Sequence, residues 1–308
     1  MSPGNAEAEL PPDISNRLVW MLGSPRTGST WLMQLFAEIP EISVIDESYI
    51  PLHLVPIDHA LPDGEYFRQG SRSDDPHYFF AQRYLPEAFS ELRTLFMRGL
   101  LRQLEELGQN TDPRWIVIKE PNGSHASDSL IQLFPEARLL FLVRDGRDVI
   151  DSLIDAMLSK DSWWQQSQGS DEPRIVSERM AFINHHAKLW LQRTQSTQRA
   201  FDALPEKQRC QVGYEDLLAD TATEFGRMLG WLGMSISPEQ LDAVVEKRSF
   251  KAIPDSQKGP GKRARSASPG QWKERLRPGE IELVEQVMGP KLQDLGYEVE
   301  GATQVQSG

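Results

Sequence analysis

The sequence predicts an α/β fold, a mostly parallel central sheet with helices on both faces. Short continuous apolar runs, such as 18–22 and 139–143, are typical of strands that are buried on both faces. Segments with helical spacing of apolar residues follow most of these runs. Strands that alternate with helices indicate a parallel sheet.

Each element rests on a local pattern. Trp31, Leu32, Leu35 and Phe36 have helical spacing and precede Pro40, which predicts a helix over 29–38. The same periodicity predicts further helices at 86–107, 127–134, 148–158, 177–201, 220–232 and 278–295. Bare apolar runs predict strands at 18–22, 43–45, 115–118, 137–143 and around 210–212.

We expect residues 1–16 to form a loose arm, 17–300 a single domain and 301–308 a disordered tail. Two stretches of the domain are irregular. Region 48–110 is rich in proline, and region 255–277 is a Gly-, Pro- and Ser-containing stretch with many cations. A solvated basic loop is the plain interpretation of the second stretch.

The composition excludes several classes of protein. With 33 basic and 45 acidic residues the net charge is −12, the opposite of a general nucleic-acid binder. No apolar run has the length of a membrane span, and no secretory signal opens the chain. A single cysteine and scattered histidines give no disulfide and no metal-ligand spacing. The composition therefore indicates a soluble, reduced, cytoplasmic protein of the size of an enzyme.

The segment 23–30, Gly-Ser-Pro-Arg-Thr-Gly-Ser-Thr, joins the first strand to the first helix. Backbone N–H groups in such a loop, together with the helix dipole, favour an anion. Its spacing is that of a phosphate loop, but Ser29 stands where a nucleoside triphosphatase carries lysine. Arg26 is the loop's only basic side chain. An anion site is favoured here over a simple tight turn.

A second anion site is predicted after the strand that ends at Val143. Arg144 stands at the carboxyl end of that strand, where ligands of open α/β sheets bind. Ser152 follows in the second turn of the next helix, and an arginine with a hydroxyl suits a phosphate. The alternative for Arg144 is an ion pair with Asp145 or Asp148. Two anion sites together suggest a nucleotide phosphorylated at two positions.

Four motifs in one order resemble the sulfotransferases that use 3′-phosphoadenosine 5′-phosphosulfate (PAPS), in a bacterial-type form. They are P-R-T-G-S-T-W at 25–31, V-R-D-G-R-D-V-x-x-S at 143–152, Y-E-D-L at 214–217 and G-x-W-K at 270–273. The resemblance covers most of 18–297. It implies the sulfotransferase fold and PAPS as cofactor without a metal. It also implies that the acceptor is a small molecule that bears a hydroxyl group. Region 48–110 and the pair Trp163-Trp164 are then expected to shape the acceptor pocket.

The resemblance also implies roles for individual residues. The 5′-phosphosulfate would be held by Arg26, Thr27, Gly28, Ser29 and Thr30. Arg144 and Ser152 would hold the 3′-phosphate, and Trp31 and Tyr214 would lie near the adenine. Trp31 has a simpler alternative, packing in the core. The basic segment would close over the 3′-phosphate through its cations and its G-x-W turn, with Lys262, Arg263, Arg265, Gly270 and Trp272 as the candidates.

The catalytic residues follow from the same resemblance. Lys119 aligns with the family's catalytic lysine, but Glu120 and Pro121 follow it, without the histidine that many animal members use as base. Tyrosylprotein sulfotransferases have a glutamate at the position of Glu47. Glu47 is the favoured base, with His53 and His125 as lesser candidates. Otherwise Glu47 caps a helix or pairs with an arginine, and Lys119 pairs with Glu120 or Asp128.

Two other functions stay open at this point. A P-loop kinase is disfavoured by Ser29 in place of the loop lysine and by the lack of an obvious Walker B aspartate. A nucleotide-binding module without chemistry would keep Arg26 and Arg144 but would need neither Glu47 nor Lys119.

Overall fold

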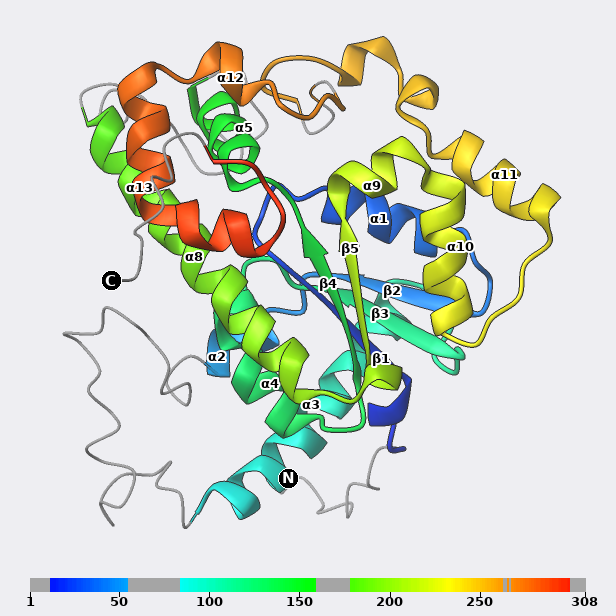
Figure 1. Cartoon of the computed structure of the whole chain (residues 1–308). Coiled ribbons are helices and arrows are strands. Elements are labelled where there is room, and N and C mark those ends of the chain that lie inside the picture. Colours follow the sequence, from blue (N-terminus) through cyan, green and yellow to red (C-terminus); the bar gives the residue numbers. More distant parts are fainter. Residues whose placement is uncertain (1–11, 55–83, 159–177, 263–264, 266, 300–308) are drawn as a thin grey trace, which may run out of the picture. The chain divides into compact units, whose positions relative to one another are not determined.

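The computed structural model describes residues 12–54, 84–158, 178–262, 265 and 267–299. Its five strands form one parallel sheet in the order β2-β3-β1-β4-β5 (Figure 1). The strands are β1 (Leu18–Leu22), β2 (Ile42–Asp46), β3 (Trp115–Lys119), β4 (Arg138–Val143) and β5 (Arg209–Gly213). Every residue of β1 and β3 is buried, as the bare apolar runs predict. The predicted α/β class is confirmed.

The predicted helices are present with ends that differ by a few residues at most. They are α1 (Ser29–Phe36), α3 (Leu85–Glu106), α4 (Ser127–Leu133), α5 (Gly146–Leu158), α8 (Arg179–Ala203), α10 (Thr221–Trp231) and α13 (Pro278–Asp294). Helices that the periodicity did not indicate are α2 (Ile50–Leu54), α9 (Tyr214–Ala219), α11 (Pro238–Lys247) and α12 (Trp272–Arg275). Short 3-10 turns are η1 (Ser15–Arg17), η3 (Ser124–Ala126), η4 (Glu206–Gln208), η5 (Phe250–Ala252) and η6 (Asp255–Gln257).

By its internal contacts the chain divides into two compact units. The first unit comprises Met1–Leu22, Phe36–Leu140 and Ser196–Arg209, and the second comprises Gly23–Leu35, Phe141–Gln195 and Cys210–Gly308. The single domain predicted over 17–300 stays a prediction.

The first unit contains the paired strands β2, β3 and β1. Strand β3 pairs in parallel with both neighbours, and the register sets Met21 and Asp46 opposite Lys119. The carboxyl ends of β2 and β3 therefore meet side by side. Ile14 and Ser15 are buried, so this part of the predicted loose arm packs against the unit.

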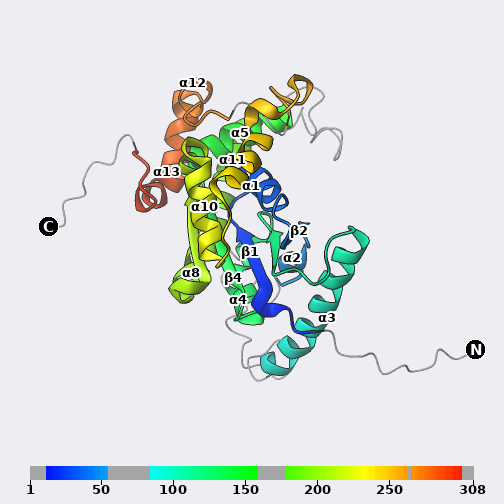
Figure 2. The same ribbon diagram turned by 90° about the vertical axis from the view of Figure 1, so that its right-hand side faces the viewer.

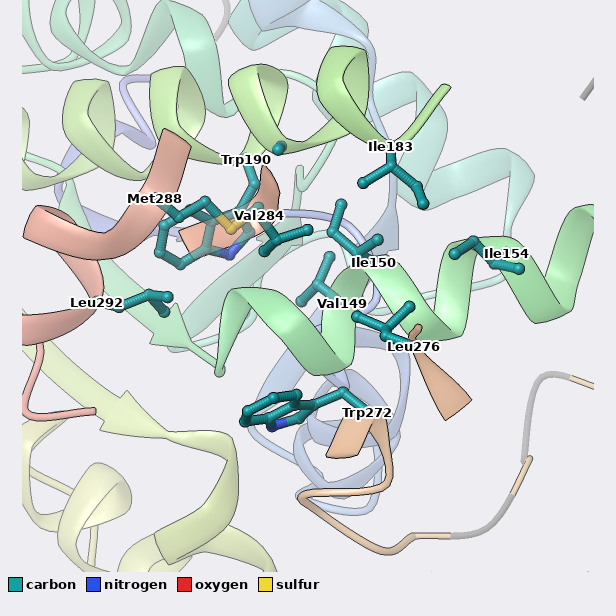
Figure 3. Close-up of a cluster of buried hydrophobic side chains, with 11 residues drawn as sticks. Val149, Ile150, Ile154, Ile183, Trp190, Trp272, Leu276, Val284, Met288 and Leu292 are labelled. Carbon is teal, nitrogen blue, oxygen red and sulfur yellow. The ribbon is translucent and has the colours of Figure 1, made fainter. Parts of the chain in front are cut away.

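The second unit has an apolar core between helices. Val149 and Ile150 of α5, Trp190 of α8 and Met288 of α13 meet there with Trp272 of α12 (Figure 3). The indole of Trp190 and the thioether of Met288 lie next to each other beside Val284 in the same view. Helices α10 and α11 are neighbours in the same unit and lie side by side in both ribbon views (Figure 2). This core fixes the start of α5, directly after Arg144.

Some expectations fall outside the described residues. They concern residues 1–11 of the arm, the whole tail 301–308, residues 55–83 of the irregular region, Trp163, Trp164 and Arg263. Among the helices that the structure describes, none combines the length and apolarity that a bilayer crossing requires.

Candidate active site

The loop between β1 and α1 is tightly packed within the second unit. Gly28 has a φ of 85°, and a Cβ there would lie 2.6 Å from the ring of Tyr214. Gly23 is as restricted, because a Cβ would lie 2.2 Å from the Leu142 carbonyl oxygen. The Thr27 hydroxyl donates to the Ser24 carbonyl, 2.9 Å away. Only glycine fits at these two turns, so the loop enters α1 in one defined shape.

Arg26, Arg144 and Ser152 are joined directly. Arg26 Nε donates to Ser152 Oγ at 3.0 Å, and Arg144 Nη1 donates to the Arg26 carbonyl oxygen at 2.8 Å. Arg26 has a left-handed backbone, with a φ of 71°. The structure thus brings together three residues that two separate motifs supplied. The two predicted anion sites belong to one cluster.

Arg144 is buried without an ion pair to either neighbouring aspartate. Its guanidinium carbon lies 4.3 Å from the ring centroid of Tyr214. Its Nε is buried and has no hydrogen-bond partner among the described residues. Asp145 instead pairs with Arg147, and Asp148 accepts from backbone N–H groups. An unpaired donor on a buried arginine is suited to an anionic ligand.

Trp31 and Tyr214 form the aromatic side of this cluster. Their rings meet edge to face, with centroids 6.4 Å apart. Trp31 Nε1 donates to the Arg248 carbonyl oxygen at 2.8 Å. Burial raises the pKa of Tyr214, although Arg144 opposes the shift. Tyr214 therefore lies as a neutral ring between Gly28 and Arg144.

The basic segment is attached to α5 by aspartates that the sequence reasoning missed. Asp148 accepts from Gly270 N at 2.7 Å and from Trp272 N at 3.3 Å. Asp151 pairs with Arg265 at 2.6 Å, and both side chains are buried. Asp155 accepts from Gly261 N at 3.0 Å. The spacing of these acids, three and four residues, places them on one face of a helix and was the available signal.

These contacts distinguish the candidates of the basic segment. Arg265 is engaged by Asp151, while Lys262 is exposed. Trp272 is buried in the core, where the Arg147 guanidinium lies 4.0 Å from its ring centroid. Burial raises the pKa of Asp148. The G-x-W turn is thus held by the carboxylate of Asp148 and by apolar packing.

The first unit brings Lys119 and Glu47 together. Lys119 is the last residue of β3, and its Nζ lies 3.0 Å from Glu47 Oε1 and also contacts Asp46. Asn122 Nδ2 donates to Glu47 Oε2 at 2.9 Å. Among the described residues, the Glu47 carboxylate therefore has Lys119 and Asn122 as partners and neither caps α2 nor pairs with an arginine. The register of β2 and β3 explains the pair, because Asp46 is opposite Lys119 and Glu47 follows it.

Lys119 does not have the partners that the simpler interpretation gave it. Asp128 pairs with Arg199, 2.8 Å away. The Glu120 carboxylate accepts from Ser48 Oγ at 2.5 Å and from Tyr49 N at 2.7 Å. Burial raises the pKa of Glu120 to about 7. Sequence reasoning missed Asn122 and the role of Glu120, and no motif signals either.

The two histidine candidates for the base, His53 and His125, lie on α2 and η3. His53 belongs to α2, and its side chain lies outside the described residues. His125 belongs to η3, where its backbone oxygen accepts from Ser196 Oγ at 3.0 Å. Neither contributes to the described contacts of Glu47 with Lys119 and Asn122.

The arrangement supplies two kinds of chemistry, one in each unit. The second unit offers two arginines, a hydroxyl and the N-terminus of α1, which suit phosphate groups. The first unit offers a carboxylate and an ammonium within contact distance, which suit proton removal and charge stabilisation. The described residues include no group of three His, Cys, Asp or Glu side chains suited to a metal ion.

Comparison with known proteins agrees with these features. The chain is similar in structure to a sulfotransferase of Mycobacterium avium, with a TM-score of 0.56 and 16% identity, over 92% of this chain and 78% of that one. It is also similar to a mouse sulfotransferase solved in complex with PAP, with a TM-score of 0.53 and 12% identity, over 91% of this chain and 85% of that one. At such identities the likeness shows the fold.

No curated protein matches the sequence. A family model, described as the sulfotransferase family, matches residues 19–238. That range includes the loop after β1, the strand β3 that ends at Lys119, Arg144 and Tyr214, and it covers well over half of the chain. By its sequence and its fold, this chain belongs to the sulfotransferase family.

Proposed function

We propose that the protein transfers a sulfuryl group from PAPS to the hydroxyl group of a small-molecule acceptor. The observation that carries the proposal is the cluster of Arg26, Arg144 and Ser152 beside a loop without lysine. Such a loop lacks the lysine that a transferable γ-phosphate requires but retains two cations for other phosphates. The family membership and the PAP bound to the mouse relative support the same cofactor.

The residues of the second unit fit the phosphates of PAPS. In this proposal the loop residues 26–30 hold the 5′-phosphosulfate, with backbone N–H groups at the start of α1. Arg144 directs its unpaired Nε to the 3′-phosphate, with Ser152 as a hydroxyl partner. The rings of Tyr214 and Trp31 line the part of the site that lies next to the adenine. Of the described cations in the basic segment, the exposed Lys262 is a better candidate than Arg265, which already pairs with Asp151.

PAPS supplies the sulfuryl group when bound, and the first unit supplies the groups that act on its transfer. Glu47 takes the proton from the acceptor hydroxyl through its carboxylate. The Lys119 ammonium stabilises the negative charge that develops on the leaving phosphate. Asn122 fixes the second carboxylate oxygen of Glu47, which orients the base. Cations and hydroxyls together neutralise the phosphates, so a metal is not needed in this scheme.

The test combines binding and turnover. Calorimetry with adenosine 3′,5′-bisphosphate, and separately with ATP plus magnesium, compares the two nucleotide classes. Transfer of radiolabelled sulfate from PAPS to phenols, steroids, sugars, lipids and tyrosyl peptides then identifies the acceptor class. We expect the bisphosphate to bind, ATP to bind more weakly, and one acceptor class to be labelled.

The alternatives predict different results. A kinase would prefer ATP with magnesium, and a binding module would bind the bisphosphate without labelling any acceptor. The cytoplasmic location expected from the sequence stays part of the proposal, and fractionation of cells that express the tagged protein tests it.

A further inference from the structure

Glu120 is a buried carboxyl group next to Lys119 that takes no direct part in the proposed chemistry. Its side chain is 0% exposed. One oxygen, Oε1, accepts from Ser48 Oγ and Tyr49 N. The other, Oε2, is buried and has no hydrogen-bond partner among the described residues. Burying a carboxyl group with one oxygen unpaired is costly. The group therefore contributes little to folding in itself.

The turn that Glu120 holds is strained. Glu47 and Tyr49 have φ values of 64° and 60°, a left-handed conformation that residues with a Cβ avoid. The cost is about 1–2 kcal/mol for each residue. Strained backbone of this kind gathers at functional sites and persists where surrounding contacts hold it. Here two left-handed residues flank Ser48 within three positions.

Two N–H groups of this turn donate hydrogen bonds to Lys119 and Glu120, and these bonds hold the turn. Glu47 N donates to the Lys119 carbonyl oxygen at 3.0 Å, which fixes the first left-handed residue. Tyr49 N donates to Glu120 Oε1 at 2.7 Å, which fixes the second. Glu120 is itself tied to the sheet, because its N–H donates to the Met21 carbonyl oxygen at 2.9 Å. The carboxyl group thus links the turn to two strands.

The position of Glu47 depends on this turn. Its carboxylate meets Lys119 Nζ at 3.0 Å and Asn122 Nδ2 at 2.9 Å from a backbone that is left-handed where it leaves β2. Building on the function proposed above, we propose that Glu120 is a positioning residue: its buried carboxyl group clamps Ser48 and Tyr49 and so holds Glu47 in place as the base. Glu120 acts through Glu47 and does not contact the acceptor.

A double-mutant cycle on kcat tests this coupling. Glu120→Ala removes the clamp. Ser48→Ala removes the hydroxyl contact with Glu120, together with the weaker hydrogen bond that Ile50 N donates to Ser48 Oγ at 3.3 Å, and guards against a failure of Glu120→Ala to fold. Each is made in the wild-type protein and in the Glu47→Gln protein. Ser43→Ala is the matched control, since Ser43 is a serine of the neighbouring strand β2, is more deeply buried than Ser48, and donates to the Asn110 carbonyl oxygen at 2.8 Å. The stoichiometry of adenosine 3′,5′-bisphosphate binding, measured by calorimetry, gives the fraction of each variant that is folded and able to bind.

In the wild-type background we expect kcat to fall about 100-fold in Glu120→Ala and less in Ser48→Ala, because a small misplacement of a reacting group is that costly. The KM for PAPS should stay within about twofold. In the Glu47→Gln background both changes should lower kcat by less than about twofold, because the residue they position can no longer act. Ser43→Ala should leave kcat unchanged in both backgrounds.

Equal losses in the two backgrounds would overturn the inference, because Glu120 would then act independently of Glu47. Unchanged kcat in the folded Glu120→Ala and Ser48→Ala proteins would overturn it as well. A wild-type protein that transfers no sulfate to any acceptor would instead overturn the proposed function, and this inference with it. The two failures are thus distinguishable in one set of measurements.

Discussion

Arg144 is the residue whose contacts most directly indicate a ligand, because a buried donor on its guanidinium lacks a partner among the described residues. We predict that Arg144→Ala weakens binding of adenosine 3′,5′-bisphosphate far more than binding of adenosine 5′-monophosphate. The loss of a charge-assisted contact should cost about 1.5–3 kcal/mol. Calorimetry with both nucleotides measures the difference.

Arg138→Ala is a suitable control for Arg144→Ala. Arg138 begins the strand that Arg144 follows, and its guanidinium also stacks on an aromatic ring, 4.3 Å from the centroid of Trp115. This control should leave both affinities unchanged. Equal losses for the two nucleotides in Arg144→Ala would show that Arg144 does not contact the 3′-phosphate.

Glu47→Gln tests the proposed base with little change in size or hydrogen bonding. An amide cannot accept the proton, and loss of a general base lowers the rate about 10²–10⁴-fold. We expect that loss in single-turnover sulfate transfer, with the affinity for adenosine 3′,5′-bisphosphate nearly unchanged. Asp128→Asn, which removes a carboxylate paired with Arg199, is the control. Normal turnover in Glu47→Gln with loss in His53→Ala or His125→Ala would move the base to a histidine.

The raised pKa of Glu120 predicts how stability changes with pH. Burial first, and the nearby Glu47 charge as well, raise that pKa from 4.5 to about 7. The folded protein therefore binds a proton more tightly than the unfolded chain does. The stability that this proton contributes is present below pH 4.5 and is lost as the pH rises through 7.

Glu120→Gln removes that titration. From pH 4.5 to pH 8, we expect its free energy of unfolding to rise relative to wild type by at most about 3 kcal/mol. Urea unfolding of both proteins across this range measures the difference. A difference that stays constant with pH would show that Glu120 does not titrate with a raised pKa.

From the sequence, single residues could be named where a motif contains them. Arg26 comes from one motif and Arg144 and Ser152 from another, and the structure joins all three. Asn122 and Glu120 could not be found in this way. Their contacts with Glu47 and Tyr49 depend on the register of β2 against β3 and on two left-handed residues, neither of which a linear pattern encodes.

At the scale of elements, helix α11 has a defined N-terminal cap. None of its residues is buried, but Ser237 and Gln240 form a capping box and Pro238 occupies the first turn. We predict that Ser237→Ala destabilises α11 by about 1 kcal/mol. Hydrogen exchange of the α11 amides should quicken, with the rest of the protein unchanged. Ser235→Ala, two residues earlier, is the control, and equal effects of both would contradict the role of the cap.

The same helix shows why element prediction from periodicity is incomplete. The strands and the long helices were predicted, because burial imposes an apolar pattern on their residues. Helix α11 has no fully buried residue, and its apolar stripe is short: Leu241, Val244 and Val245, which are half-buried. A second signal is local, the Ser-Pro-x-Gln start, which is a helix-start signature in its own right.

At the scale of the whole molecule, the core of the second unit supports the predicted cofactor residues. Gly146 begins α5 two residues after Arg144, and a Cβ there would lie 2.6 Å from Met288 Sδ and 2.9 Å from the Trp190 ring. Both side chains belong to the core shown in Figure 3. The fold class was predictable from the apolar runs. This close packing was not, because it joins three helices that are distant in the sequence.

Two glycine-to-alanine changes should therefore alter global stability in opposite directions. In Gly146→Ala the Trp190 ring cannot move freely, and overpacking should cost about 1–3 kcal/mol. In Gly99→Ala the new Cβ meets open space inside helix α3, so the change should stabilise by about 0.5–1 kcal/mol through helix propensity. Urea unfolding gives both values.

Adenosine 3′,5′-bisphosphate should bind more weakly to Gly146→Ala only, because a shifted α5 displaces Arg144 and Ser152. Normal affinity in a destabilised Gly146→Ala protein would separate the core from the cofactor site.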